Sequence, residues 1–309
     1  MKSKVLVIVG PTASGKSNLA VRLAKKFGGE IISADSRQVY KGLNIGTGKI
    51  TKKEMRGVPH HLLDVANSKK QFSASDFIIK ANEALRLIEA NKAFPIIVGG
   101  TGFYIDALTG KIPLPEVPPD KLLRRKLNKL NKEKLFRMLK KKDPARAKII
   151  DRDNKVRLIR ALEIVESLGN VPKAIEANEA KKLRSFIYIG LKPNDLDKSI
   201  YKRLIKRILG IIRETKKLSF KRAYELGLEY RYAALYLKKR LTKREFIDQL
   251  FTAIRQYSRR QMTWFKRNKK IRWFTPSAVE GFKPGDYREI ERYVRVLKEK
   301  GNGGIRDRR

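Results

Sequence analysis

Apolar and polar positions alternate along the first hundred residues in blocks typical of strands and helices. Residues 5–9 are an unbroken aliphatic run, which predicts a strand buried on both faces of a parallel sheet. Residues 17–27 carry apolar side chains at helical spacing, and 30–34 read as a second strand. A helix over 76–91 and a third buried strand at 95–98 follow. This order predicts a doubly wound α/β fold that binds its ligand at the carboxyl ends of the strands.

The pattern changes near Lys111, where four prolines within seven residues form a stiff boundary. Residues 121–160 then read as helical almost throughout. Residues 185–190 look like a return to the sheet, 243–270 a basic helix and 271–274 a last strand.

We therefore predict two domains. Residues 1–110 and 185–309 form a core with basic C-terminal helices, and residues 111–184 form a mainly helical, basic insertion. The tail over 301–309 is expected to be disordered.

Charge narrows the choice of partners. The 309 residues include 73 Lys and Arg against 31 Asp and Glu, a formal net charge of +42. Residues 121–160 alone carry 17 basic against 4 acidic residues, a one-sided surplus that favours a surface for nucleic-acid phosphates over an ordinary solvated face. A lysine-rich proteome would raise the total without any binding role. The chain has no cysteine, signal peptide or apolar run of membrane-spanning length, so we expect a cytoplasmic protein without disulfides or a membrane anchor.

One motif carries specific chemistry. A glycine-rich segment follows the first strand and opens the first helix, which is the context that confirms a P-loop, the phosphate cradle of nucleotide- and ATP-binding proteins. Its backbone amides and the Lys16 ammonium would hold phosphates, and the Ser17 hydroxyl would hold Mg²⁺. The predicted phosphate ligands are Gly10, Thr12, Ala13, Ser14, Gly15, Lys16 and Ser17.

A kinase or ATPase would also need an acidic residue at a strand end to hold Mg²⁺. The third strand runs into Gly99, Gly100 and Thr101 without a carboxylate. The acid is instead Asp35, after the second strand, where it suits a general base facing the phosphates; a cap or loop-stabilising role is the alternative.

Several segments in order resemble the tRNA dimethylallyltransferases. The resemblance spans roughly 4–274 and rests on the P-loop and on 35–42 (DSRQVYKG), 45–49 (IGTGK), 59–64 (PHHLLD), 98–104 (VGGTGFY), 154–163 (NKVRLIRALE) and 259–265 (RRQMTWF). It implies transfer of a dimethylallyl group from its diphosphate to the amine of the adenine just 3′ of the anticodon, in tRNAs that read codons beginning with U. The P-loop would then hold a diphosphate rather than ATP.

The resemblance also implies residue roles. Asp35 would accept the proton from the amine, and Thr101 would hydrogen-bond near the bridging oxygen of the leaving diphosphate. The remaining implied contacts are to the adenine and tRNA, from Asp35, Ser36, Arg37, Gln38, Thr101, Arg124, Lys155, Arg157 and Arg160. We expect a monomer that binds the anticodon stem-loop.

One segment departs from the family pattern. Two extra residues separate Gly227 from the pair Tyr230 and Arg231. We assign Arg231 to the diphosphate, and Arg222 is the alternative.

Three other functions stay open: a P-loop kinase of a small metabolite, an adenylate isopentenyltransferase and a non-catalytic RNA-binding protein. A kinase needs a second metal-holding acid, the adenylate enzyme gains nothing from the basic insertion, and a binding protein has no use for Asp35 and Thr101. His60 and His61 are interpreted as a packed or tRNA-facing loop rather than a metal site. Trp264, Phe265, Trp273 and Phe274 are interpreted as core residues.

Overall fold

The computed structural model describes residues 2–172, 184–276 and 282–299. The chain forms two compact units, Met1–Gly110 with Glu179–Arg309, and Lys111–Asn178. The first unit is built on a six-stranded sheet in the order β3-β2-β4-β1-β5-β6, in which all paired strands are parallel. The strands are β1 Ser3–Val9, β2 Gly29–Ser33, β3 His60–His61, β4 Phe94–Gly99, β5 Arg184–Leu191 and β6 Arg272–Phe274. The predicted doubly wound α/β fold is thus confirmed.

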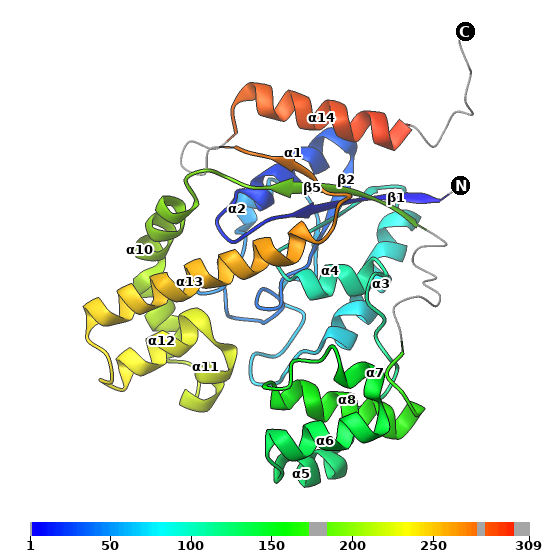
Figure 1. Ribbon diagram of the computed structural model, residues 1–309. Helices are drawn as coiled ribbons and strands as arrows, with labels where there is room; N and C mark the ends of the chain where they lie inside the picture. Colours follow the sequence, from blue (N-terminus) through cyan, green and yellow to red (C-terminus); the bar gives the residue numbers. More distant parts are fainter. Residues whose placement is uncertain (1, 173–183, 277–281, 300–309) are drawn as a thin grey trace. The chain divides into compact units, whose positions relative to one another are not determined.

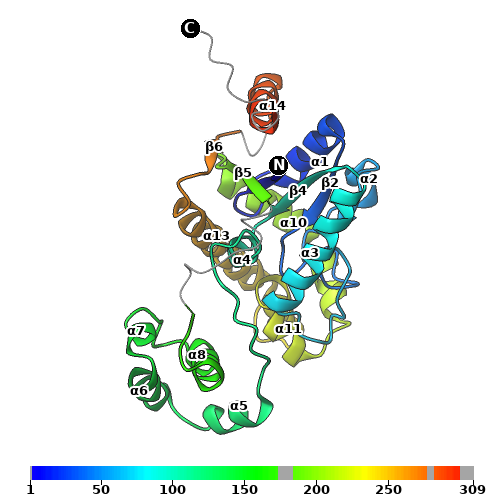
Figure 2. The ribbon, with the colours of Figure 1, turned by 90° about the vertical axis from the view of Figure 1, so that its right-hand side faces the viewer.

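Helices cover both faces of this sheet. The helices of the first unit are α1 Lys16–Phe27, α2 Lys52–Met55, α3 Ala74–Ala90, α4 Gly102–Leu108, α10 Leu196–Thr215, α11 Phe220–Leu226, α12 Leu228–Leu237, α13 Lys243–Lys266 and α14 Pro284–Glu299. Helices α3, α4 and α13 bury apolar side chains such as Phe77, Ile105 and Phe265 against one face. Helices α1 and α14 bury Leu19 and Ile290 against the other. Figure 1 shows α14 above the sheet with α4 and α13 below it, and Figure 2 shows the same layers turned by 90°.

The carboxyl edge of the sheet is supported by a third apolar cluster. Helices α10, α12 and α13 pack together through side chains such as Leu204 and Phe246, and Ala13 of the P-loop belongs to the same cluster. The hydroxyl of Ser199 on α10 also donates to the carbonyl of Ala13 at 3.3 Å. The P-loop therefore rests directly on the helices that follow the insertion.

The second unit is a small helical bundle of α5 Lys121–Asn128, α6 Lys132–Lys142, α7 Pro144–Ala147 and α8 Lys155–Leu168. Its core includes Leu135, Leu139, Leu158 and Leu162, which are at most 1% exposed. Helices start at good capping residues: the carboxylate of Asp120 accepts two backbone N–H groups of α5. The helical reading of 121–160 is thereby resolved into four helices.

The structure differs from the prediction for the two histidines and agrees with the prediction for the four aromatic residues. His60 and His61 do not lie in a loop but form the edge strand β3, which pairs with Ile31 and Ile32. Their polar side chains do not follow the apolar pattern of a strand, and His61 Nε2 forms a hydrogen bond with Glu30 Oε2 at 2.7 Å. The four aromatic residues do pack on the core, with Phe265 and Phe274 buried. The tail over 301–309 lies outside the described residues.

Candidate active site

The segment from Gly10 to Ser17 joins β1 to α1 and bends tightly. Gly15 has φ 82° and Ala13 φ 62°, both left-handed. A Cβ on Gly10 would lie 2.9 Å from the carbonyl oxygen of Leu191, so no other residue fits there. Within the described residues the buried Ser14 hydroxyl has no hydrogen-bond partner. A curled loop with an unsatisfied hydroxyl at the N-terminus of α1 fits an oxyanion.

Lys16 supplies positive charge to this loop. Its Nζ donates to the carbonyl of Pro11 at 3.0 Å, which folds the side chain back over the loop. Desolvation lowers the pKa of Lys16 to about 8, Asp35 opposes this shift, and Arg203 adds to it. A bound anion would stabilise the protonated form and raise this pKa again.

Two arginines that the sequence analysis missed extend this positive region. Arg203 and Arg207 lie one turn apart on α10, and their guanidinium groups lie over Gly48. A Cβ on Gly48 would collide with Arg207 and would lie 3.1 Å from Arg203 Nη2. Arg207 also pairs with Glu229 at 3.1 Å, whereas no acceptor among the described residues binds Arg203. Lys16 and Arg203 therefore leave cationic groups available to an anion.

Asp35 and Thr101 follow the neighbouring strands β2 and β4 at the carboxyl edge. Asp35 Oδ1 accepts the backbone N–H groups of Arg37 at 2.8 Å and Gln38 at 3.3 Å. No donor among the described residues binds Oδ2, so one oxygen fixes the loop and the other is left for chemistry. Thr101 Oγ1 accepts the N–H of Ser36 at 3.0 Å, which leaves its own O–H able to donate. The structure thus brings the two predicted catalytic residues together.

Gln38 lies beside this pair with its amide fixed at both ends. Its Oε1 accepts the hydroxyl of Ser33 at 3.1 Å, and its Nε2 donates to the carbonyl of Gly48 at 3.5 Å. Tyr257 of α13 also borders the site: desolvation, and then the negative charge of Asp35, raises its pKa. A neutral tyrosine and a fixed amide are suited to binding a polar heterocycle.

Gln261 connects the P-loop to the loop that carries Thr101. It is only 6% exposed. Its Oε1 accepts the N–H of Thr12 and its Nε2 donates to the carbonyl of Gly100, each at 2.9 Å. The Thr12 amide, predicted to bind phosphate, is therefore already occupied by a side chain. Trp264, one turn later, covers Gly102 and donates to Asp106 at 2.7 Å.

Arg231 and Arg222 lie on α12 and α11 and contact protein groups. The Arg231 guanidinium stacks over Tyr224, 4.4 Å from the ring centroid, and donates to the Tyr224 carbonyl at 3.2 Å. Arg222 donates to the carbonyls of Ser68 and Lys70. Among the described residues, neither arginine forms a hydrogen bond or ion pair with the P-loop, so the diphosphate role of Arg231 stays a prediction.

The four predicted tRNA-binding side chains of the helical unit fall into two pairs. Arg124 makes two hydrogen bonds to Glu163, at 2.6 and 2.8 Å, and Arg160 contacts the same carboxylate at 3.4 Å. Burial would raise the pKa of Glu163, but Arg124 and its other donors outweigh this and lower it. Lys155 and Arg157 do not bind this carboxylate. Lys155 Nζ donates to the carbonyl of Asn128 at 2.9 Å, and Arg157 is 61% exposed, with its ion pair to Asp151 at 3.6 Å.

Comparison with known proteins identifies the family. Residues 38–268 match the model of the IPP transferases, which covers most of the chain.

The chain belongs to the IPP transferase family.

Individual relatives agree with this assignment. The chain is 42% identical over 280 residues to tRNA dimethylallyltransferase 2 of Treponema denticola, covering 87% of this chain and 93% of the relative. It is 36% identical over 284 residues to a tRNA dimethylallyltransferase of Anoxybacillus flavithermus, covering 89% and 91%. Among solved structures, the full-length tRNA isopentenylpyrophosphate transferase of Bacillus halodurans has a TM-score of 0.71 at 34% identity, covering 97% of this chain and 98% of the other. A eukaryotic dimethylallyltransferase acting on tRNA has a TM-score of 0.79 at 26% identity, covering 99% and 82%.

Three site residues of this IPP transferase were not predicted from its sequence, and only one of them had a sequence pattern that could have indicated its role. Gln261 occupies a core-facing position of α13, in register with buried Ile254 and Phe265, and a glutamine there predicts a buried hydrogen bond. Arg203 and Arg207 gave no such signal among 73 basic residues. In the part of the chain that the structure describes, no cluster of His, Asp or Glu side chains could hold a metal ion, and no helix is long and apolar enough to cross a membrane.

Proposed function

We propose that this protein transfers a dimethylallyl group from dimethylallyl diphosphate to the exocyclic amine of the adenine 3′-adjacent to the anticodon, in tRNAs that read codons beginning with U, releasing diphosphate. The observation that carries the proposal is the pairing of a P-loop with Asp35 and Thr101 on adjacent strand ends, without a second metal-holding acid there. Family membership supports the same reaction, and the enzyme would be a tRNA dimethylallyltransferase.

The donor's diphosphate would lie in the P-loop. Amides of the loop, Lys16, and the guanidinium groups of Arg203 and Arg207 would neutralise the charge that develops as it leaves. The Thr101 O–H would donate to the bridging oxygen as the bond from that oxygen to the allylic carbon breaks. Three cations at one edge of the sheet suit a leaving group that ends with more negative charge than it began with.

A magnesium ion would be held at this edge by the Ser17 hydroxyl as its protein ligand. Ser17 is partly exposed at the start of α1, and the first turn of that helix carries no acidic residue. Mg²⁺ commonly takes few protein ligands and completes its shell with phosphate oxygens and water. When bound it would supply further neutralisation of the diphosphate.

The acceptor adenine must leave its base stack to reach the site. Gln38, with Ser36 nearby, would hold the base, and its amine would attack the allylic carbon. Oδ2 of Asp35, which no protein donor occupies in the described structure, would take the proton that the amine loses. The basic helical unit would bind the anticodon stem-loop. We expect the protein to act as a monomer in the cytoplasm.

Mass analysis of reacted acceptors tests this function. The protein and Mg²⁺ are incubated with tRNA or free AMP as acceptor and with dimethylallyl diphosphate or ATP as donor. We expect a prenylated adenosine only with tRNA and dimethylallyl diphosphate. Prenylated AMP would instead identify an adenylate isopentenyltransferase, and phosphate transfer from ATP a kinase.

A further inference from the structure

Glu214 is a buried carboxylate next to the site whose role the reaction described above does not use. It lies near the end of α10 and is 7% exposed. Its Oε1 accepts the N–H groups of Asn44 and Ile45 at 2.9 and 2.7 Å, and its Oε2 accepts that of Gly46 at 2.8 Å. The hydroxyl of Tyr230 donates to Oε2 at 2.9 Å. Three successive amides and a hydroxyl thus satisfy an anion that forms no ion pair within the described residues.

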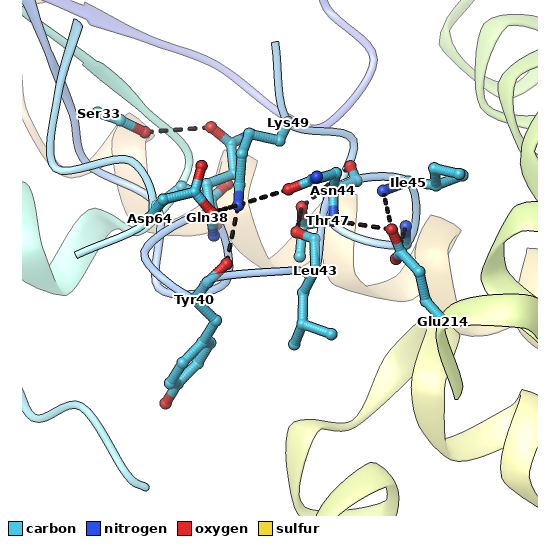
Figure 3. A network of polar contacts seen from close by, with 12 residues as sticks. Ser33, Gln38, Tyr40, Leu43, Asn44, Ile45, Thr47, Lys49, Asp64 and Glu214 are labelled. Atoms are coloured by element: carbon cyan, nitrogen blue, oxygen red, sulfur yellow. Dashed lines mark hydrogen bonds and ion pairs between the residues drawn. The ribbon is translucent and has the colours of Figure 1, made fainter. Parts of the chain in front are cut away.

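This carboxylate attaches one specific loop to α10. We name residues 43–49 the anchored loop, and Figure 3 shows it with Glu214 on one side and Lys49 on the other. Ile45 packs so closely on the helix that a Cβ on Gly210 would lie 2.5 Å from its side chain. On the other side, Lys49 Nζ donates to Tyr40 O, Asn44 Oδ1 and Asp64 Oδ1 at 2.8, 2.9 and 2.6 Å.

The anchored loop contacts both halves of the site. Its Gly48 carbonyl accepts the amide of Gln38, the side chain proposed to hold the adenine. The same Gly48 lies under the guanidinium groups of Arg203 and Arg207, which come from the same helix as Glu214 and are proposed to neutralise the donor's diphosphate. Any displacement of the loop from α10 would therefore move the Gly48 carbonyl and remove one of the two hydrogen bonds that fix the Gln38 amide, leaving only that from Ser33.

We propose that Glu214 is a positioning residue for the acceptor: by binding the amides of residues 44–46 it fixes the anchored loop and thereby the orientation of Gln38. This inference rests on the proposed transfer of a dimethylallyl group to tRNA. Glu214 does not touch either substrate. It acts through Gly48 and Gln38, so its contribution should disappear when Gln38 is absent.

A double-mutant cycle tests this dependence. The second-order rate constant for an anticodon stem-loop RNA is measured with saturating dimethylallyl diphosphate for wild type, Glu214→Gln, Gln38→Ala and the double variant. A glutamine presents an NH₂ group to backbone donors, so we expect Glu214→Gln alone to lower kcat/KM for RNA by roughly 10- to 100-fold. In the Gln38→Ala background the same change should cost less than about threefold. The Kd for dimethylallyl diphosphate should stay within about twofold, because Lys16 of the P-loop and Arg203 and Arg207 of α10 all lie outside the anchored loop.

Two variants separate positioning from general stability. Tyr230→Phe removes one hydrogen bond but keeps the three amide contacts, and we expect less than about a threefold loss of kcat/KM. If Glu214→Gln does not fold, the cycle is run with Glu214→Asp, which keeps the charge but cannot reach all three amides. If the fold-losses of kcat/KM in the single variants multiply in the double variant, or if Tyr230→Phe loses as much kcat/KM as Glu214→Gln, the positioning role of Glu214 is wrong. The proposed function would still stand in either case. An inactive wild type would refute the proposed function, and this inference with it.

Discussion

Replacing Gln261 with leucine tests whether the distance between the P-loop and Thr101 is set by a side chain. The change removes two hydrogen bonds of 2.9 Å and leaves the Thr12 N–H and the Gly100 carbonyl unpaired at a position only 6% exposed. Each unpaired buried group costs about 1–3 kcal/mol, and partial solvation reduces the sum to about 2–4 kcal/mol of the free energy of unfolding. At about 2–4 °C per kcal/mol, Tm should fall by roughly 5–15 °C.

Catalysis should suffer more than stability at assay temperature. A shift of the P-loop against Thr101 by about 1 Å can cost roughly 10²-fold in rate, so we expect kcat/KM for dimethylallyl diphosphate to fall by about that factor. The assay is single-turnover transfer into a stem-loop RNA, well below the Tm of the variant. Gln256→Leu is the matched control, because Gln256 is exposed on the same helix and should change neither quantity. A Gln261→Leu protein with normal kcat/KM would show that the two loops hold their distance without this side chain.

Three further predictions concern the charges. Lys16→Ala should lower transfer by about 10²–10³, and normal turnover of this variant at saturating donor would contradict the proposed role of Lys16. The pKa of Lys16 is about 8 and its protonated form is the one proposed to bind the donor. Wild-type kcat/KM for the donor should therefore be constant well below pH 8 and fall as the pH rises through about 8, and this fall should be absent from the variant. Asp35→Asn should lower turnover by roughly 10²–10⁴ while leaving RNA affinity nearly unchanged; an equal loss in both would make Asp35 an adenine-binding residue. Replacing both Lys155 and Arg157 with alanine should reduce the slope of log Kd for RNA against log salt concentration by about 1.4–1.8. An unchanged slope would show that Lys155 and Arg157 do not bind RNA phosphates. Arg124→Ala should mainly lower Tm, because it removes a hydrogen-bond partner of the buried Glu163 carboxylate.

How far the sequence predicts the molecule depends on the kind of contact. The buried strands and the P-loop are local patterns, so β1, β2, β4 and β5 and the turn at Gly15 are predicted within a few residues. Asp35 and Thr101 could be placed together because parallel strands end at one edge of a sheet. Strand β3 was missed because its two histidines do not have the apolar pattern of a buried strand.

Contacts between distant segments could not be predicted in the same way. The hydrogen bonds from Glu214 to the amides of the anchored loop join residues that are 168 to 170 positions apart in the chain. No periodicity in the sequence indicates which carboxylate binds which amide. The basic residues were difficult for a different reason: so many are present that the sequence does not indicate which are exposed and which form ion pairs. Only the structure separates Arg124, which balances a buried carboxylate, from the exposed Arg157.

We propose that this P-loop holds the diphosphate of a prenyl donor facing an adenine of tRNA. The most direct measurement is the mass of each nucleotide in an anticodon stem-loop RNA after reaction with the protein, Mg²⁺ and dimethylallyl diphosphate. We expect one added dimethylallyl group, on the adenine 3′-adjacent to the anticodon, and no added group when that base is changed to guanine. A prenyl group elsewhere in the RNA, or none on any nucleotide, would contradict it.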